Sequence, residues 1–331
     1  MNVGVIGAGG WGTTVAELLG KKGFTVTLWV HGERTFSALK KWNENIFYLK
    51  GIKLTHIAKY TMDINEALRQ KELVVLAVPA QKLRKVIEEV PYPKDSIIVN
   101  LAKGIENGTN KRMSEVIGEV WNDVSLDNIA TISGPNFAIE IAREMPAATV
   151  VGGISEPYLK EIQKIFMTKY FRVYYTTDIV GVELGGSLKN VLAVGAGISD
   201  GLGFGDSSKS SLIVRGIREL IRFGTKLGGR EKTFYGLSGI GDLIATSFSK
   251  KSRNRWAGEE IGKGRSKEEI EEMTKQAIEG IYTVKSIYEM KNKFDVEMPI
   301  TEAIYNIIYR GKSPKYELGR LMERPPKKEI L

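Results

Sequence analysis

The sequence contains no cysteine and only two histidines among its 331 residues. Without cysteine, disulfide bonds, thiolate nucleophiles and zinc–thiolate sites are excluded. No apolar run reaches the length of a membrane-spanning helix, and the first residues, MNVGVIGAGG, lack the basic segment of a signal peptide. We therefore expect a cytoplasmic protein with no integral membrane segment and no metal site.

The chain also lacks a concentrated basic patch, although its net charge is +9. Its densest basic group, KKSRNR at 250–255, is short, whereas a nucleic-acid surface requires clustered basic residues with aromatic residues between them. Hydrophobic residues make up 42% of the chain and charged residues 26%, as in ordinary globular proteins. The positive balance thus favours a small anion such as a phosphate as the partner, and no nucleic acid.

A glycine-rich turn follows the first apolar segment. Residues 3–6 are typical of a strand and run directly into GAGGWG, which places glycines in the spacing G-x-G-x-x-G. Gly7 permits the tight turn, Gly9 lets the backbone approach a pyrophosphate, and Gly12 allows the next helix to pack closely on the strand. A helix over 11–22 and a strand over 25–30 follow, so the sequence predicts a dinucleotide site at the N-terminus of that helix.

Strands and helices alternate over the first half of the chain only. The segments at 72–80 and 96–104 are largely apolar, which is typical of strands in a parallel sheet buried on both faces. Further strand-like segments occur at 128–138, 147–153 and 170–176, and a helical pattern occurs at 156–166. From about residue 180 the pattern is helical with glycine breaks. The prediction is a Rossmann-type, mostly parallel α/β domain over 1–180 and an all-helical substrate-binding domain over 181–331.

The end of the second strand bears on the choice of coenzyme. NAD-preferring sites usually carry Asp or Glu there, which binds the ribose hydroxyls, but this strand ends WVHGER. His31 occupies that position and Arg34 lies just beyond, so a 2′-phosphate is not repelled. Both residues could instead be solvated turn residues. The pattern favours NADP(H) over NAD(H).

The acid–base group is expected to be a lysine. His31 lies at the adenosine end, and His56 lies in an early segment away from the predicted nicotinamide end. Lys103 follows the strand SIIVNLA, at the carboxyl edge of the sheet where open α/β folds bind ligands. The alternative is that Lys103 is an exposed loop lysine.

The second candidate lysine lies in LGGSLKNVLAVGAG, residues 184–197, which otherwise resembles a buried helix. Lys189 has Gly185, Gly186, Ala193 and Ala196 as helical neighbours, which predicts an open groove around its ammonium group. Because burying a charge costs several kcal/mol, an unsolvated lysine here needs a partner or a function. The alternative is a lysine whose charged end reaches the surface.

Two further polar segments belong to these candidates. Asp242 and Thr246 are four residues apart and share a helix face, and Ser252 is a plausible N-cap for a helix whose start, with Arg253, suits a phosphate. The alternative is a cap with solvated charges. In SGPNFA, Pro135 suits the first position of a helix.

Together these segments resemble the bacterial-type NAD(P)-dependent glycerol-3-phosphate dehydrogenases. The resemblance is collinear over GAGGWGT, NLAKGIE, SGPNFA, LGGSLKNVLAVGAGISDGLGFGDSSKSSLIVRG, GLSGIGDLIATSFSKKSRNRWAG and AIEGIYTVKS. It implies interconversion of dihydroxyacetone phosphate and sn-glycerol 3-phosphate, the glycerol unit of phospholipids, by a homodimer.

The resemblance also implies roles for individual residues. Lys189 becomes the proton donor to the substrate carbonyl, because hydride addition leaves an alkoxide that must be protonated. The implied substrate residues are Lys103, Gly134, Asn136, Asn190, Asp242, Ser252, Arg253 and Asn254. The residues expected at the coenzyme, counting those derived above, are Gly7, Gly9, Gly10, Trp11, Gly12, His31, Arg34, Lys103, Ala138, Arg253 and Glu279. The chain departs from the family at Gly10, often Ser, at His31, often Arg, and at Asn136, often Ser or Thr.

Two other functions fit parts of the pattern. A lysine-dependent reductase of the same two-domain plan, of the ketopantoate or 3-hydroxyacid type, would share the glycine turn and the buried lysine. The phosphate-suited segment at 252–254 argues against it. A nucleotide-binding redox sensor acting on DNA would need a basic recognition helix, and the sequence shows none that stands apart.

Overall fold

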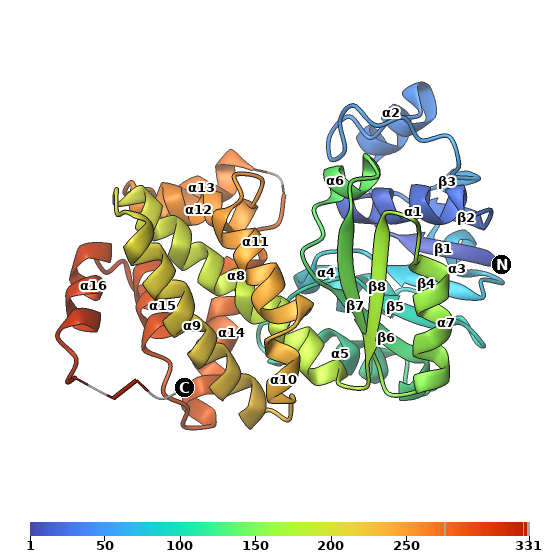
Figure 1. The fold of residues 1–331 in the computed structure, drawn as a ribbon. Helices are drawn as coiled ribbons and strands as arrows, with labels where there is room; N and C mark the ends of the chain where they lie inside the picture. The colour runs from blue at the N-terminus through green and yellow to red at the C-terminus, as the bar shows by residue number, and fades with distance from the viewer. Residues whose placement is uncertain (275, 327, 330–331) are drawn as a thin grey trace.

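The computed structural model describes residues 1–274, 276–326 and 328–329. One half contains a sheet and the other consists of helices, and the two lie side by side in Figure 1. The last strand ends at Thr176 and the first helix of the second half begins at Ile179. The predicted fold class is confirmed, and the placement of a domain boundary at residue 180 stays a prediction.

The sheet has eight strands in the order β3-β2-β1-β4-β5-β6-β7-β8. Their bounds are β1 Asn2–Ile6, β2 Thr25–Trp29, β3 Lys59–Thr61, β4 Leu73–Leu76, β5 Ile97–Asn100, β6 Ile129–Ser133, β7 Ala147–Gly152 and β8 Phe171–Thr176. All neighbouring pairs are parallel except β6 and β7, which run antiparallel. The order reverses at β1, so the loops after β1 and β4 open a crevice at the carboxyl edge of the sheet.

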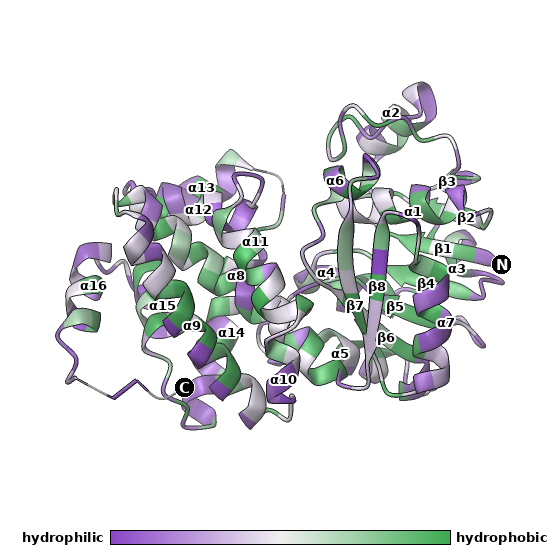
Figure 2. Ribbon diagram, viewed as in Figure 1, coloured by the Kyte–Doolittle hydropathy of each residue, from purple (hydrophilic) through white to green (hydrophobic). Residues whose placement is uncertain are grey.

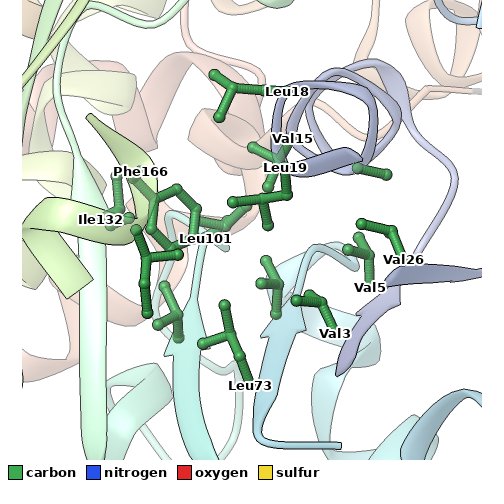
Figure 3. Packing of buried hydrophobic residues seen from close by; sticks show 14 of the residues in the cluster. Val3, Val5, Val15, Leu18, Leu19, Val26, Leu73, Leu101, Ile132 and Phe166 are labelled. Carbon is green, nitrogen blue, oxygen red and sulfur yellow. The ribbon is translucent and has the colours of Figure 1, made fainter. Parts of the chain in front are cut away.

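Helices cover both faces of the sheet. They are α1 Gly10–Lys21, α2 Glu33–Trp42, α3 Ile64–Leu68, α4 Ala80–Glu88, α5 Met113–Val120, α6 Ala138–Ala142 and α7 Glu156–Phe166. Helices α1 and α7 pack on the face to which Val3 and Val5 point, and Figure 3 shows Leu19 and Phe166 in that core. Helices α3, α4 and α5 pack on the opposite face, with Ile6 among their neighbours.

The hydrophobic pattern of the strands follows from this layering. Strands β4 and β5 are buried at every position, as their continuously apolar sequences require. The edge strand β8, FRVYYT, alternates instead, with Arg172 exposed between buried Phe171 and Val173. In Figure 2 the interior strands are largely hydrophobic while β8 carries a hydrophilic band.

The helical half is organised around one long central helix. Its elements are α8 Ile179–Gly201, α9 Asp206–Lys226, α10 Glu231–Phe234, a π-helical turn Leu237–Gly241, α11 Asp242–Phe248, α12 Arg253–Gly262, α13 Lys267–Met273, α14 Glu279–Lys293, α15 Pro299–Arg310 and α16 Pro314–Met322. Helix α8 is in contact with α9, α11, α12 and α14. A Cβ on Gly197 would lie 2.0 Å from the carbonyl oxygen of Arg255, so glycine lets α8 and α12 approach closely.

Helix α8 corrects one expectation from the sequence. It has 23 residues and contains an 18-residue window with a mean hydropathy of 1.3, so by length and composition it is apolar enough to cross a membrane. The expectation that no apolar run reaches that length was therefore wrong. Within this protein 89% of the apolar window is buried, as in the core helix of a folded domain.

The SGPNFA segment supplies a second correction. Helix α6 begins at Ala138 with Phe137 at its N-cap, so Pro135 is not the first helical residue. After β6 the chain turns at Gly134, whose φ is 157°. Residues 134–137 form the turn that carries the chain away from the sheet, so the helix starts only after them.

Candidate active site

The three glycines of the N-terminal turn have distinct surroundings. Gly7 has φ 119°, and a Cβ there would lie 2.7 Å from the carbonyl oxygen of Ala77. A Cβ on Gly12 would lie 2.0 Å from the carbonyl oxygen of Gly7, so only glycine lets α1 start this close to β1. Gly9 has no atom within 4 Å of its Cβ position, which faces open space at the N-cap of α1. An anion can therefore approach the backbone at Gly9 and the first N–H groups of the helix.

Several buried polar atoms near this turn have no protein partner. The indole nitrogen of Trp11, the amide oxygen Oδ1 of Asn136 and the carboxylate oxygen Oε2 of Glu279 make no hydrogen bond within the described part of the chain. Buried polar groups are normally paired, so these atoms are suited to a polar ligand. With the open cradle at Gly9, the residues present fit a dinucleotide.

A single cleft of about 630 Å³ joins the glycine turn to the helical half. The predicted site residues that line it are Gly7, Gly9, Gly10, Trp11, Gly12, His31, Lys103, Asn136, Ala138, Lys189, Asn190, Asp242, Ser252, Arg253, Asn254 and Glu279. Gly134 and Arg34 do not line it. The fold thus brings together segments separated by more than 200 residues of sequence.

The residues after β2 lie at one end of this cleft. His31 is exposed, and its ring centroid lies 5.6 Å from that of Trp29. The Arg34 guanidinium lies 4.1 Å from the centroid of the Phe47 ring, and Arg34 is not among the residues that line the cleft. Contact between Arg34 and a 2′-phosphate stays a prediction.

Two lysines share one carboxylate in the cleft. Lys189 Nζ lies 3.0 Å from Asp242 Oδ1 and 2.8 Å from Thr246 Oγ1, while Lys103 Nζ lies 2.7 Å from Asp242 Oδ2. Lys103 Nζ also donates to the carbonyl oxygen of Gly134 at 2.8 Å. Lys189 and Asp242 are buried, with 6% and 3% of their surfaces exposed, so this cluster carries a net positive charge in a desolvated place.

This setting changes the proton affinities of both partners. The pKa of Lys189 is lowered to about 8: burial is the largest cause, the positive charges of Lys103 and Arg253 act in the same direction, and Asp242 opposes them. Burial alone would raise the pKa of Asp242, but the ammonium groups of Lys103 and Lys189 outweigh it and hold that pKa below its usual range. A lysine with a pKa near neutrality can exchange a proton during catalysis.

The small neighbours of Lys189 do not form the open groove that the sequence predicts. A Cβ on Gly185 would lie 3.1 Å from the carbonyl oxygen of Ser238, and one on Gly186 would lie 2.5 Å from Ser133 Oγ. Ala193 and Ala196 are fully buried. These small residues admit the neighbouring segments of the protein rather than a ligand, and the expectation was wrong.

The start of α12 has a side-chain N-cap and an asparagine that bonds to two other helices. Ser252 Oγ accepts a hydrogen bond from the backbone N–H of Arg255 at 3.1 Å, which makes it the N-cap, as the sequence predicts. Asn254 donates to Asn190 Oδ1 at 2.8 Å and accepts from the backbone N–H of Gly280 at 2.9 Å. Ser252 therefore caps α12, and Asn254 holds α12 against α8 and α14.

The remaining residue of that segment is free to meet a ligand. Arg253 is exposed in the cleft, and its guanidinium donates to the carbonyl oxygen of Ala277 at 2.9 Å. Glu279 lies nearby; one of its carboxylate oxygens accepts from the backbone N–H of Ala80 at 3.0 Å, and burial raises its pKa to about 7. Direct contact of either residue with substrate or coenzyme stays a prediction.

Two details concern residues that the sequence left unexplained. A Cβ on Gly10 would lie 2.8 Å from the carbonyl oxygen of Tyr48, so a serine here would require that segment to shift. The sequence predicts that Thr246 shares a helix face with Asp242 but assigns it no role, whereas in the structure its hydroxyl group contacts both Asp242 and Lys189. The spacing of four residues was the signal that could have assigned it.

Within the described residues, no group of three or more His, Asp or Glu side chains could hold a metal ion.

Comparisons with known proteins agree with this arrangement. Two family models match: the NAD-dependent glycerol-3-phosphate dehydrogenase N-terminus over residues 2–157 and the C-terminus of the same family over residues 178–318. The chain is 46% identical to glycerol-3-phosphate dehydrogenase [NAD(P)+] of Syntrophotalea carbinolica and 43% identical to that of Chlorobium limicola, each covering 100% of both chains.

Solved structures extend the comparison to three dimensions. The crystal structure of glycerol-3-phosphate dehydrogenase from Coxiella burnetii is 32% identical, with a TM-score of 0.92 over 98% of this chain and 99% of the other. A ketopantoate reductase from Ralstonia eutropha is 13% identical with a TM-score of 0.59 over 96% of this chain and 100% of the other, so it shares the fold alone.

Proposed function

The chain belongs to the NAD-dependent glycerol-3-phosphate dehydrogenase family, and on this premise we propose that it interconverts dihydroxyacetone phosphate and sn-glycerol 3-phosphate. It is an NAD(P)-dependent oxidoreductase. The observation that carries the proposal is the buried Lys189 ammonium group, held by Asp242 in the cleft that begins at the glycine turn. A buried lysine with a lowered pKa is the acid–base group that a carbonyl reduction needs.

Bound nicotinamide supplies the hydride in reduction and accepts it in oxidation. Lys189 donates a proton from Nζ to the carbonyl oxygen of the substrate as negative charge develops on it. Asp242 and Thr246 hold that ammonium group at 3.0 and 2.8 Å and fix its direction. In the reverse reaction neutral Lys189 removes the proton from the hydroxyl group, so the rate of each direction depends on pH through a pKa of about 8.

The substrate phosphate is assigned to the start of α12. Arg253 is exposed in the cleft and can pair with a phosphate through two parallel N–H groups, while the free backbone N–H groups of the helix add a partial positive charge. Lys103 and Asn136 line the same cleft. Binding the phosphate away from the reacting carbon helps to orient the carbonyl group.

The direct test is coenzyme oxidation. Purified protein should oxidise NADPH or NADH when dihydroxyacetone phosphate is added, and reduce the oxidised coenzyme with sn-glycerol 3-phosphate. Ketopantoate and 3-oxoacids should give no comparable rate, and a gel-shift assay should show no sequence-specific complex with DNA. Turnover of ketopantoate with none of dihydroxyacetone phosphate would overturn the proposal in favour of the related reductases.

Three finer assignments complete the proposal. NADPH is the preferred coenzyme, because no acidic side chain occupies position 31. The enzyme acts in the cytoplasm as a homodimer and supplies glycerol 3-phosphate for phospholipid synthesis. Sedimentation analysis of the purified protein and fractionation of cells test the dimer and the location, and a monomer or a membrane-bound pool would contradict them.

A further inference from the structure

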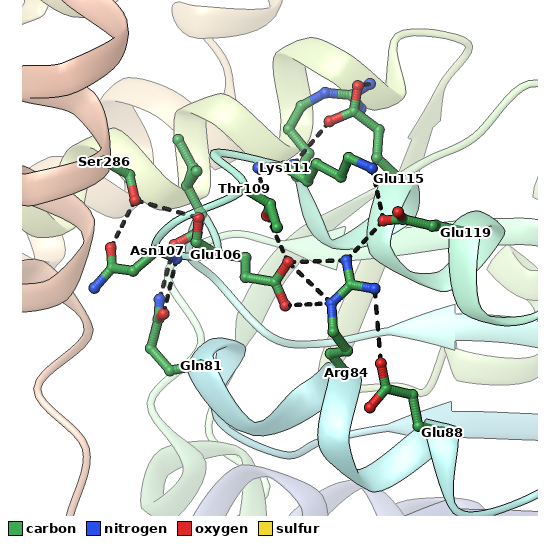
Figure 4. Close-up of polar contacts among 12 residues, drawn as sticks. Gln81, Arg84, Glu88, Glu106, Asn107, Thr109, Lys111, Glu115, Glu119 and Ser286 are labelled. Atoms are coloured by element: carbon green, nitrogen blue, oxygen red, sulfur yellow. Dashed lines mark hydrogen bonds and ion pairs between the residues drawn. The ribbon is translucent and has the colours of Figure 1, made fainter.

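The loop that carries Lys103 is held from two sides. Residues 101–112 leave the sheet after β5 and pass between α4 of the sheet half and α14 of the helical half (Figure 4). Lys103 and Glu106 lie on this loop three residues apart. Loops are usually the more mobile parts of a structure, so a side chain that must meet Asp242 at 2.7 Å needs its loop fixed.

On the α4 side the loop is fixed by an ion pair. The Arg84 guanidinium donates to both carboxylate oxygens of Glu106. Its Nε lies 3.0 Å from Oε1 and 3.2 Å from Oε2, and its Nη2 lies 2.9 Å from Oε2. The hydroxyl group of Thr109 donates to the same carboxylate at 2.5 Å. Only 8% of Glu106 is exposed, so solvent screens this pair far less than it screens the surface pairs of Arg84.

Hydroxyl and amide groups of α14 and α4 also hold the loop. Ser286 donates to Asn107 Oδ1 at 2.6 Å, and its hydroxyl oxygen lies 3.4 Å from the carbonyl oxygen of Glu106. Gln81 of α4 donates to the carbonyl oxygen of Ile105 at 2.7 Å and accepts from the backbone N–H of Asn107 at 3.0 Å. Each of residues 105 to 107 is thus tied to an element outside the loop.

The space around the loop leaves little freedom at its start. A Cβ on Gly104 would lie 2.6 Å from the Cβ of Ala80 and 3.2 Å from Glu279 Oε2. The backbone beside Lys103 is therefore pressed against α4 and the start of α14. A shift of the Glu106 segment would move Lys103 away from Asp242.

We propose that Glu106 is a positioning residue: clamped by Arg84 and Thr109, it holds the loop so that the Lys103 ammonium group stays on the carboxylate of Asp242. This inference rests on the proposed function. Glu106 itself does not line the cleft, so it acts through Lys103 and touches neither substrate nor coenzyme.

The consequence for Lys189 has a definite sign. The charged groups that act on Lys189 are Asp242, Lys103 and Arg253. If Lys103 moves away, Lys189 loses a repelling cation and no longer shares Asp242. Its ammonium form is then stabilised, and it stays protonated to higher pH.

The experiment compares Glu106→Gln with wild type and with Glu88→Gln in the full-length enzyme. Glu88 pairs with the same Arg84 at 3.8 Å but lies exposed on α4, and within the described part of the chain it makes no hydrogen bond or ion pair with the loop, so the charge change is matched. For Glu106→Gln we expect kcat/KM for dihydroxyacetone phosphate to fall by about tenfold to a hundredfold. The pH at which the rate of reduction falls to half of its maximum should rise by about one unit.

Glu88→Gln should match wild type in both respects. Thr109→Val, which removes one hydrogen bond and keeps the ion pair, should shift the same pH midpoint in the same direction by less. Arg84→Lys should recover part of the rate relative to Arg84→Gln.

Two results would overturn the inference. One is a Glu106→Gln enzyme with the wild-type rate and pH midpoint. The other is a lowered melting temperature with a rate reduced equally at every pH, which is the result of general loosening. An inactive wild type would refute the proposed function instead, so the two failures are distinguishable.

Discussion

The two ends of the cleft differ in the groups that form them. At the coenzyme end these groups belong to the backbone, because the contiguous residues 7 to 12 provide an open cradle and the start of a helix. At the substrate end they are the side chains of Lys103, Lys189 and Asp242, which come from the loop after β5, α8 and α11 and meet only in the folded protein. The first end depends on shape and the second on charge.

This difference predicts how each end responds to substitution. At the coenzyme end a bulky side chain should block binding without altering proton transfer. At the substrate end a change of charge should alter proton transfer while coenzyme binding remains. The four substitutions below test that separation, beginning with the largest expected effect.

Lys189→Met should lower kcat by roughly 10²–10⁴-fold, the usual contribution of general acid–base catalysis. Methionine is one heavy atom shorter than lysine and has no amino group to donate a proton. Coenzyme affinity, measured by NADPH fluorescence titration, should stay close to wild type because the glycine turn is untouched. Near-normal turnover by this variant would remove Lys189 from the mechanism.

Arg253→Leu should lower kcat/KM for dihydroxyacetone phosphate by about 2 kcal/mol, or roughly thirtyfold. This is the lower end of the range for losing one member of a charge pair, because Arg253 is solvent-exposed. Unphosphorylated dihydroxyacetone should be turned over slowly but almost equally by both enzymes. A proportional loss with both substrates would place the phosphate site elsewhere.

Gly9→Val should weaken coenzyme binding by about tenfold, because its side chain would fill the open cradle at the start of α1. Gly205→Val is the matched control. Gly205 is also a helix N-cap in extended conformation with nothing within 4 Å of its Cβ position, but it begins α9 and does not line the cleft. Calorimetric titration with NADPH should separate the two, and equal affinities would contradict the cradle.

His31→Asp should move the preference from NADPH toward NADH by a few-fold, since a new carboxylate repels a 2′-phosphate at an exposed position. The ratio of kcat/KM for the two coenzymes measures it, and the effect should shrink at high salt. An unchanged ratio at low salt would show that this turn does not contact the ribose.

The sequence predicted the coenzyme end well because its signal is local. Three glycines between a strand and a helix determine the backbone path, and their spacing can be recognised without knowing the fold. The alternation of strands and helices in the first half and the helical pattern of the second half followed from hydrophobic patterns alone.

The substrate end was harder because its contacts are made between distant segments. The buried position of Lys189 was predictable, but its sharing of Asp242 with Lys103 was not, since no periodicity links residues that lie 139 positions apart in the sequence. The groove expected beside Gly185 was wrong for the same reason: a sequence shows that residues are small, and only the fold shows what fills the space. The Arg84–Glu106 clamp left no signal in either segment.

In the proposed mechanism a lysine with a pKa of about 8, which shares its carboxylate partner with a second lysine, protonates the substrate. The most direct measurement is the pH dependence of kcat for dihydroxyacetone phosphate reduction in wild type and in Asp242→Asn. Reduction requires the ammonium form, so wild-type activity should fall as pH rises through about 8. Asp242 raises the pKa of Lys189, so the remaining activity of Asp242→Asn should fall at lower pH. The same midpoint in both enzymes, or wild-type activity that stays level well above pH 8, would contradict the account.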